Sequence, residues 1–442
     1  MRQIKNSIVI SVFFVSALCF SQKKWTLQEC VAYALENNIT VKKAENTLLI
    51  NDQDIIASKG SFLPSVSGSA SHGLSLGQSQ LFEGSFVNRT SNSTNFGVRV
   101  SENVFNGFRT TYLYKQAQLN LETSELELNR IKDDISLNVA NSYLNVLFNK
   151  EQLETAKAQY DFSTKQLQQV KDLVDAGTQP RVNIYDAEAT LANDEQALTV
   201  AENNFTLSLL TLSQLLQVPF EGFDVQVIEV DTPSEALLYD DVSPILDFAM
   251  ENRNEIKIAE KNIDNSEINT KLSKAGYLPS VSFGYSFGTN VFFTNLSTTE
   301  EAFFTQLEDN KGHSFNLNVN IPIFSQFQNK TAVAKSKIRE DNAQLDLDQA
   351  KLNLESNIQR AYTDAQAAFK TYESAKKSLE SQELSFNNSQ ERFNIGAMNA
   401  FELEQSRIRY INAQASLINA KYDFVFKTKV LDFYMGKTIK IN

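Results

Sequence analysis

The sequence contains an internal duplication, because its two halves carry the same short motifs in the same order. A Leu-Pro-Ser motif at residues 63–65 recurs at 278–280, and Gly177 has its counterpart in Gly396. A repeat of this length is a duplicated half-molecule rather than a short solenoid unit. Every structural element of one half is therefore expected again in the other. We expect a first repeat over 22–217, a linker over 218–243 and a second repeat over 244–442.

Two long segments, 108–176 and 323–395, contain neither glycine nor proline. At 1.5 Å per residue, continuous helices of this length would extend roughly 100 Å. Small and apolar residues recur along them at steps of three and four, which is typical of a coiled-coil seam. A glycine follows each segment, where a left-handed residue can end a helix. We expect two long antiparallel helical hairpins that turn at 177–181 and 396–399.

Segments ahead of each hairpin alternate between apolar and small polar residues. This period of two is typical of membrane barrel strands, with apolar side chains toward lipid. Alternation alone leaves open an antiparallel sheet that covers a soluble core. We expect strands over about 62–77, 94–105, 278–292 and 313–323. The candidates for lipid contact are Phe96, Val98, Val100, Val281, Phe283, Tyr285, Phe287, Phe315, Leu317, Val319 and Ile321.

Four strands are too few for a barrel. A transmembrane barrel needs about eight strands or more. Open sheet edges cannot lie in lipid, because their backbone groups would have no hydrogen-bond partners there. Two chains would supply eight strands and three would supply twelve. The strands therefore predict an oligomer that shares one barrel.

The N-terminal residues and the net charge indicate which classes of protein the chain can belong to. Residues 1–21 have a basic start and an apolar stretch, which predicts a signal peptide cleaved after Ser21. In the alternative, Cys19 is acylated, but Leu18 stands where that signal needs a small residue. A net charge of -12 argues against nucleic acid as a partner. Two histidines leave little material for a catalytic or metal site, so we expect no enzyme and no cofactor.

The order of motifs resembles the TolC family of trimeric outer-membrane efflux channels. The motifs that carry the resemblance are residues 25–35, Leu63-Pro64-Ser65 and its copy at 278–280, Val104-Phe105-Asn106-Gly107, Pro322-Ile323-Phe324, and the turns over 175–186 and 392–404. The resemblance implies a mostly α, mixed α+β membrane protein. Three protomers would share a twelve-stranded barrel in the outer membrane of a Gram-negative bacterium, joined to a periplasmic α-barrel. It also implies a periplasmic adaptor and an inner-membrane pump or ABC exporter as partners.

In that family an acidic residue commonly lies near the periplasmic constriction, six positions after the turn glycine. Carried over, those positions are Asn183 and Glu402, and three residues further on lie Asp186 and Gln405. Each half thus keeps one carboxylate, at a different position. Surface charge on a solvated helix face is the alternative interpretation. The candidates for adaptor contact at the tips are Gly177, Arg181, Gly396 and Met398.

Two functions follow from these patterns. The first is the passive exit duct of a tripartite efflux or type I secretion system, opened at its helical tips by the adaptor and pump. The alternative is a non-transport, periplasm-spanning coiled-coil structural protein. Neither the helical pattern nor the strand pattern identifies the transported substrate.

Overall fold

The computed structural model describes residues 24–82, 84–227, 239–297, 299 and 301–437. The predicted signal peptide and part of the predicted linker lie outside these residues. The two halves of the chain repeat one element order. The first half runs α1 (Leu27–Asn37), α2 (Ile39–Gly60), β2 (Ser65–Phe82), β3 (Ser85–Asn106), α3 (Arg109–Asp175) and α4 (Val182–Leu216). The second runs α5 (Ser243–Asn252), α6 (Asn254–Ala275), β5 (Ser280–Thr294), β6 (Gly312–Asn320), α8 (Gln328–Asn394) and α9 (Ala400–Tyr434).

The lengths of the paired helices agree closely. Helices α3 and α8 each have 67 residues, and α4 and α9 each have 35. One helix, α7 (Phe303–Asp309), lies between β5 and β6 and has no counterpart in the first half. Among the described residues, no helix combines the length and the apolar composition needed to cross a membrane.

The chain divides into two compact units, each of which draws on both halves. Unit 1 holds the residues up to Lys43, Leu128–Arg253 and the chain from Lys351 onward. Unit 2 holds Ala44–Glu127 and Asn254–Ala350. The hairpin turns therefore belong to unit 1 and the long strands to unit 2.

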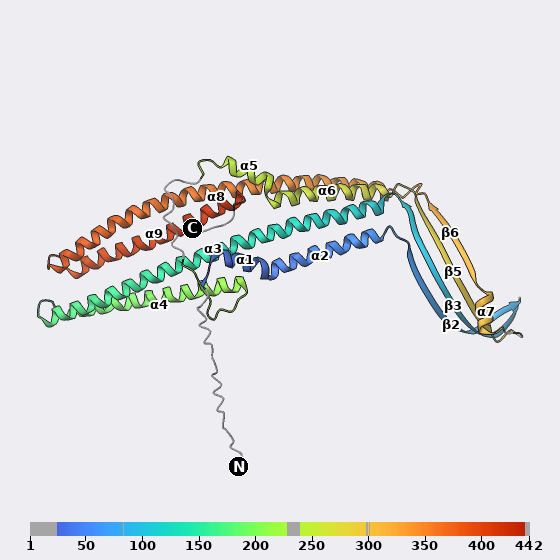
Figure 1. Ribbon diagram of the computed structural model, residues 1–442, viewed down its shortest axis with the longest axis horizontal. Coiled ribbons are helices and arrows are strands. Elements are labelled where there is room, and N and C mark those ends of the chain that lie inside the picture. The colour runs from blue at the N-terminus through green and yellow to red at the C-terminus, as the bar shows by residue number, and fades with distance from the viewer. Residues whose placement is uncertain (1–23, 83, 228–238, 298, 300, 438–442) are drawn as a thin grey trace, which may run out of the picture. The chain divides into compact units, whose positions relative to one another are not determined.

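Unit 2 contains an antiparallel sheet with the strand order β2-β3-β5-β6 (Figure 1). Strand β3 begins at Ser85, earlier than the expected residue 94, and β2 continues to Phe82. The early part of β3 is rich in Ser, Asn and Thr and lacks alternation, so its pairing with β2 rather than its pattern makes it a strand. Strand β6 ends at Asn320, which places Ile321 beyond the sheet.

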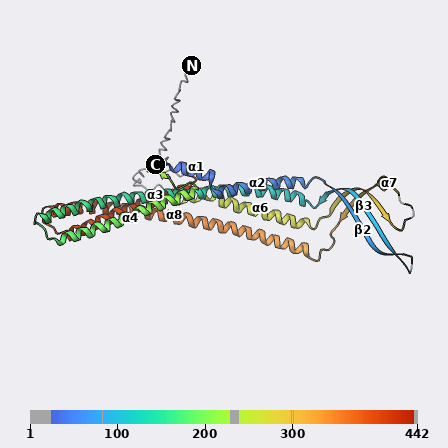
Figure 2. The same cartoon turned by 90° about the horizontal axis from the view of Figure 1, so that it is seen from below.

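The helical part of unit 2 follows the order of the strands. Neighbouring helices are joined by polar side chains: Asn51 of α2 to Ser124 of α3, Gln116 of α3 to Asn265 of α6, and Thr270 of α6 to Glu340 of α8. The order α2, α3, α6, α8 is seen in both views (Figures 1 and 2). Each strand therefore continues into, or out of, a helix at the same place in the row.

Unit 1 has the main apolar core. It joins side chains from α1, α3, α4 and α9, among them Leu27, Val139, Leu212 and Tyr422. Within it the Tyr143 hydroxyl donates 2.6 Å to the carbonyl oxygen of Gln226. Burial raises the pKa of Tyr143 well above its usual value, so this hydroxyl remains a donor even in alkaline solution. The core thus fixes α1 and the short parallel pair β1 (Lys24–Trp25) and β4 (Asp224–Val225) against the hairpins.

Gly107, between β3 and α3, gives a test of the close packing between the two halves of the chain in unit 2. Its φ is +67°, and a Cβ there would lie 2.8 Å from the Ala275 carbonyl oxygen and 2.9 Å from Leu278 Cβ. We expect Gly107→Ala to lower the free energy of unfolding by roughly 2–4 kcal/mol, from left-handed strain and overpacking together. Denaturant unfolding of the detergent-solubilised protein, followed by circular dichroism, measures this loss.

Gly177→Ala is the matched control for this variant. Gly177 also has a positive φ, +75°, but nothing lies within 4 Å of its Cβ position. It should lose only the strain, about 1–2 kcal/mol. Equal losses in the two variants would contradict the close approach at Gly107.

Candidate functional site

The two hairpin turns are built alike and lie at one end of unit 1 (Figure 1). At the first, the N–H of Gly177 donates to the Val174 carbonyl and that of Thr178 to the Leu173 carbonyl. At the second, Gly396 donates to Phe393 and Ala397 to Arg392 in the same pattern. Both glycines have φ near +75°. This is the Schellman arrangement, which satisfies the last carbonyls of a helix and requires a left-handed residue.

The helices that return from the turns begin differently. The Asn399 side chain caps α9 by accepting a hydrogen bond of 2.9 Å from the backbone N–H of Glu402. The first residue before α4, Arg181, makes no side-chain cap. The Glu402 carboxylate lies in the first turn of α9, where it also interacts favourably with the helix dipole. Glu402 therefore has a structural role available to it whether or not it contributes to a gate.

The gate candidates lie on two different hairpins. Asp186 is exposed on α4, while Glu402 and Gln405 are exposed on α9. Asn183 is partly buried and donates 3.1 Å to the Gln179 side chain. All four lie within the first two turns after a hairpin reversal. Their role in a gate stays a prediction.

The adaptor-contact candidates also differ in their surroundings. Arg181 is exposed beside the first turn. Met398 is partly buried and packs against a cluster formed by Phe386, Phe393 and Leu403. This apolar cluster therefore supports the second turn. The contact of either turn with an adaptor stays a prediction.

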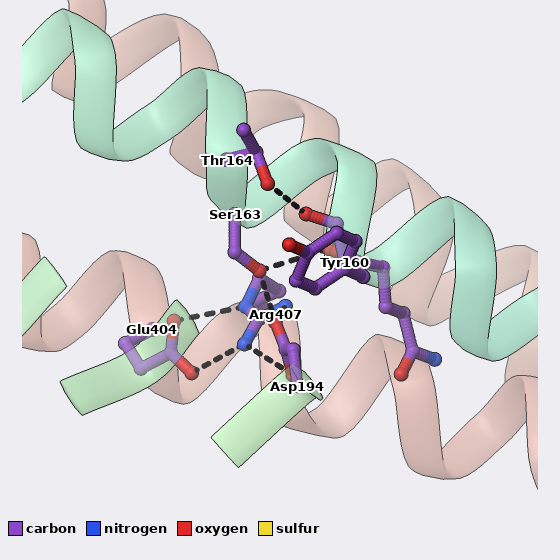
Figure 3. Close-up of polar contacts among 7 residues, drawn as sticks. Tyr160, Ser163, Thr164, Asp194, Glu404 and Arg407 are labelled. Carbon is purple, nitrogen blue, oxygen red and sulfur yellow. Dashed lines mark hydrogen bonds and ion pairs between the residues drawn. The ribbon is translucent and has the colours of Figure 1, made fainter. Parts of the chain in front are cut away.

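A buried charge cluster lies behind the tips, and the sequence analysis did not single it out. The Arg407 guanidinium of α9 donates hydrogen bonds of 2.8 and 3.3 Å to the two carboxylate oxygens of Asp194 on α4. It also donates 2.9 and 3.0 Å to both oxygens of Glu404. The Ser163 hydroxyl of α3 donates to Asp194 as well, at the same carboxylate oxygen that accepts from Arg407 Nη1 (Figure 3). Three helices from both halves of the chain meet at this one arginine.

Burial makes this cluster energetically important. The side chains of Arg407 and Asp194 are only 5% and 10% exposed. Burial by itself lowers the pKa of Arg407, but hydrogen bonds to Glu404 and Asp194 outweigh it, and the pKa lies above its usual value. The guanidinium is therefore charged at every accessible pH. Its fork geometry suits two carboxylates at once, which a lysine could not match.

The sequence contains a signal for this cluster. Asp194 falls within the three-and-four stripe Ile184, Ala187, Leu191, Asp194, Leu198 of α4, and Arg407 falls between Leu403 and Tyr410 of α9. A charged residue in an apolar stripe requires a partner, because unpaired buried charges are very costly. Two opposite charges in two such stripes predict a pair. The carboxylate that accepts from Ser163 is buried and already bound by Arg407, so the cluster is best explained by a structural role.

The strand candidates gather on one face of the sheet. The register pairs Val66 with Val100, Val100 with Tyr285 and Tyr285 with Phe315. The same face therefore carries Phe96, Val98, Val281, Phe283, Phe287, Leu317 and Val319. Phe315 and Leu317 are each 69% exposed. Contact of this face with lipid stays a prediction.

The sequence of the chain matches the family model described as "Outer membrane efflux protein" over residues 31–217 and 245–437. Among curated proteins, the outer membrane protein TolC of Vibrio cholerae serotype O1 is 20% identical over 302 residues. The match covers 68% of this chain and 67% of that protein.

Solved structures share the fold over nearly the whole chain. CusC superposes with a TM-score of 0.78 at 16% identity and covers 93% of this chain and 92% of its own. VceC of Vibrio cholerae gives 0.76 at 14% identity, with 93% and 97% covered. The Campylobacter jejuni outer membrane channel CmeC gives 0.77 at 18% identity, with 94% and 86% covered. At these identities the likeness concerns the fold.

The buried cluster yields a stability prediction. Arg407→Gln leaves Asp194 buried without its cation, and we expect a loss of roughly 3–5 kcal/mol in the free energy of unfolding. The double variant Asp194→Leu/Arg407→Met replaces the pair with apolar side chains and should lose much less. Denaturant unfolding of the purified protein measures all variants. Lys427→Gln removes a more exposed pair with Asp364 and should cost about 1 kcal/mol or less. A loss in Arg407→Gln no larger than in this control would contradict the assignment.

Proposed function

Since the chain belongs to the outer membrane efflux protein family, we propose that it is the outer-membrane exit duct of an efflux or secretion system, working as a homotrimer. The family is one of efflux proteins rather than enzymes. In this proposal the chain performs no chemistry. It provides a path across the outer membrane of a Gram-negative bacterium, and a pump elsewhere supplies the work.

The proposal rests on the edges and on the apolar face of the four-stranded sheet. Its four described strands leave two edges, β2 and β6, and an apolar face on which Phe315, Leu317 and Val319 of β6 are 69%, 69% and 52% exposed. Soluble proteins avoid both features, because open edges and large apolar patches lead to aggregation. Both are accounted for together if the apolar face meets lipid and β2 of one copy pairs with β6 of the next.

Closure of the barrel sets a minimum of two copies of the chain. A barrel needs about eight strands or more, so one chain cannot form it. Three copies give twelve strands, which is the assembly that the family resemblance implies. The helices of unit 2 follow the strands in the same order, so closing the sheet closes the helical layer with it.

The turns of the hairpins are the proposed site of opening. We place contact with a periplasmic adaptor at Arg181, Met398 and the turn glycines, because both hairpin turns lie at the same end of unit 1 (Figure 1). The adaptor would belong to an inner-membrane pump or ABC exporter. Carboxylates near the turns, Asp186 and Glu402, would form threefold rings in the trimer, which attract cations.

Two neighbouring residues of β6 test which solvent meets each face. Leu317 lies on the apolar face and Asn316 on the polar face. In lipid, Leu317→Arg should cost roughly 2–4 kcal/mol near the bilayer midplane, whereas Asn316→Arg should cost little. The readout is folding of the detergent-unfolded protein into phosphatidylcholine vesicles, scored by resistance to protease and by trimers on unheated gels.

The opposite result favours the structural alternative. In a soluble scaffold the Leu317 side chain already faces water, since Leu317 is 69% exposed. An arginine at this position would therefore be tolerated. Equal folding of the two variants, or a monomer in the soluble periplasmic fraction, would refute the duct.

Glu402 gives a test of the gate. We expect Glu402→Gln to lower the preference for K⁺ over Cl⁻, measured as the reversal potential of single channels in a KCl gradient across planar bilayers. Gln405→Glu should raise it, because it adds a carboxylate one turn further along α9. An unchanged potential in both variants would remove these positions from the gate and leave the duct itself standing.

A further inference from the structure

The polar face of the sheet has an uneven charge. Its residues alternate with those of the apolar face and consist mainly of Ser, Gly and Asn. In the described strands, from Ser65 to Ser79 of β2 and throughout β3, β5 and β6, this face carries two charged residues, Arg89 and Arg99. The strand carboxylate Glu102 belongs to the other face, opposite Phe283. A chain with a net charge of -12 thus presents only positive charge here.

The two arginines have different surroundings. The guanidinium of Arg89 lies 5.3 Å from the centre of the Phe292 ring, and its Nε is buried. Arg99 is exposed, and among the described residues it has no ion pair or hydrogen-bond partner for its side chain. Arg89 therefore packs at one end of the sheet, whereas Arg99 remains available to a solute.

The register places Arg99 in a row of small hydroxyl side chains. It pairs with Ser67 on β2 and with Ser286 on β5, which in turn pairs with Ser314 on β6. Hydroxyls both donate and accept, so this row can support an anion but offers no carboxylate to compete for the guanidinium. The arginine is thus set among neutral groups in the middle of the sheet.

A row of glycines lies next to Arg99 along the strands. Gly97 pairs with Gly288, and Gly288 pairs with Gly312. With no side chains in this row, the sheet has a hollow of about 600 Å³ that Arg99, Ser69 and Ser286 help to line. The guanidinium can therefore be approached from the side by a solute that carries an oxyanion, and its planar fork binds carboxylate or phosphate oxygens in pairs.

We propose that Arg99 is a specificity-determining residue that biases the strand section of the duct toward solutes bearing carboxylate or phosphate groups. The inference rests on the proposed function, in which the polar face lines the path and three copies contribute three Arg99 side chains. Rings of arginine favour anions in a pore. The strand section and the acidic turns then select for opposite charges at two places along one path.

The first experiment uses two introduced thiols on the polar face. Ser286→Cys lies beside Arg99, whereas Asn318→Cys lies on β6, opposite Ser282 and four residues further along the strand direction. At a rise of about 3.3 Å per residue it is farther from Arg99 than a Debye length, about 10 Å at 0.1 M salt. Cys30 is buried, so the unmodified chain reports the background.

The measured quantity is the rate of labelling by an anionic and by a cationic methanethiosulfonate in vesicle-inserted trimers. At Ser286→Cys, adding Arg99→Gln should lower the anionic-to-cationic rate ratio by roughly threefold to tenfold, since one nearby charge acts oppositely on the two reagents. Arg99→Lys should keep the ratio, and Asn318→Cys should be unaffected by either change. A ratio at Ser286→Cys that does not respond to Arg99→Gln overturns the inference.

A second readout separates this inference from the proposed function. In planar bilayers Arg99→Gln should shift the reversal potential toward cation selectivity, opposite in sign to Glu402→Gln. Channels that conduct but show no shift overturn the role of Arg99 alone. A trimer that does not conduct, and in which neither thiol reacts with either reagent, overturns the duct and the inference with it.

Discussion

The backbone hydrogen bonds at the edges of the four-stranded sheet constrain the whole molecule. Among the described residues, strands β2 and β6 each have one side without a strand partner, and one face of the sheet is apolar. A soluble monomer would have to cover both, but among the described residues α7 packs against the end of β5 and leaves Phe315 and Leu317 exposed. The proposed trimer satisfies the edges by pairing and the face by lipid, and it follows from the same need for internally satisfied backbone groups that governs every membrane protein.

The helical unit resolves a different problem. Long hairpins with many small residues pack closely, and specific contacts are needed to fix one hairpin against the other, as in the Phe162–Phe386 ring pair and the Lys421–Glu151 ion pair. The buried guanidinium of Arg407 supplies a further contact of this kind, because it binds carboxylates on α4 and α9 at once. Buried ion pairs add little net stability compared with apolar packing, but they penalise any arrangement that separates the partners. This cluster therefore defines the register between the two halves more than it strengthens the unit.

Much of the fold could be predicted from the sequence, for identifiable reasons. Gly177 and Gly396 mark the turns because only a residue tolerant of positive φ can end a helix in that way. The family resemblance is confirmed by the family model, which covers both halves. The beginning of β3 could not be predicted, because its residues lack alternation and become a strand by pairing with β2. The Asp194–Arg407 pair could not be predicted from periodicity, because both charged residues occupy positions of an otherwise apolar repeat. Its partners lie more than two hundred residues apart, which periodicity cannot connect.

The matched helix lengths carry a consequence for how such a chain can evolve. Helices α3 and α8 are equally long, and so are α4 and α9, although the motifs of the two halves have diverged. An insertion in one hairpin alone would shift its turn relative to the other and move Asp194 away from Arg407. We therefore expect changes in length to occur in both halves together, or in segments such as α7 that have no counterpart among the described residues of the first half. The duplication that simplified the origin of the molecule has since tied the growth of each half to that of the other.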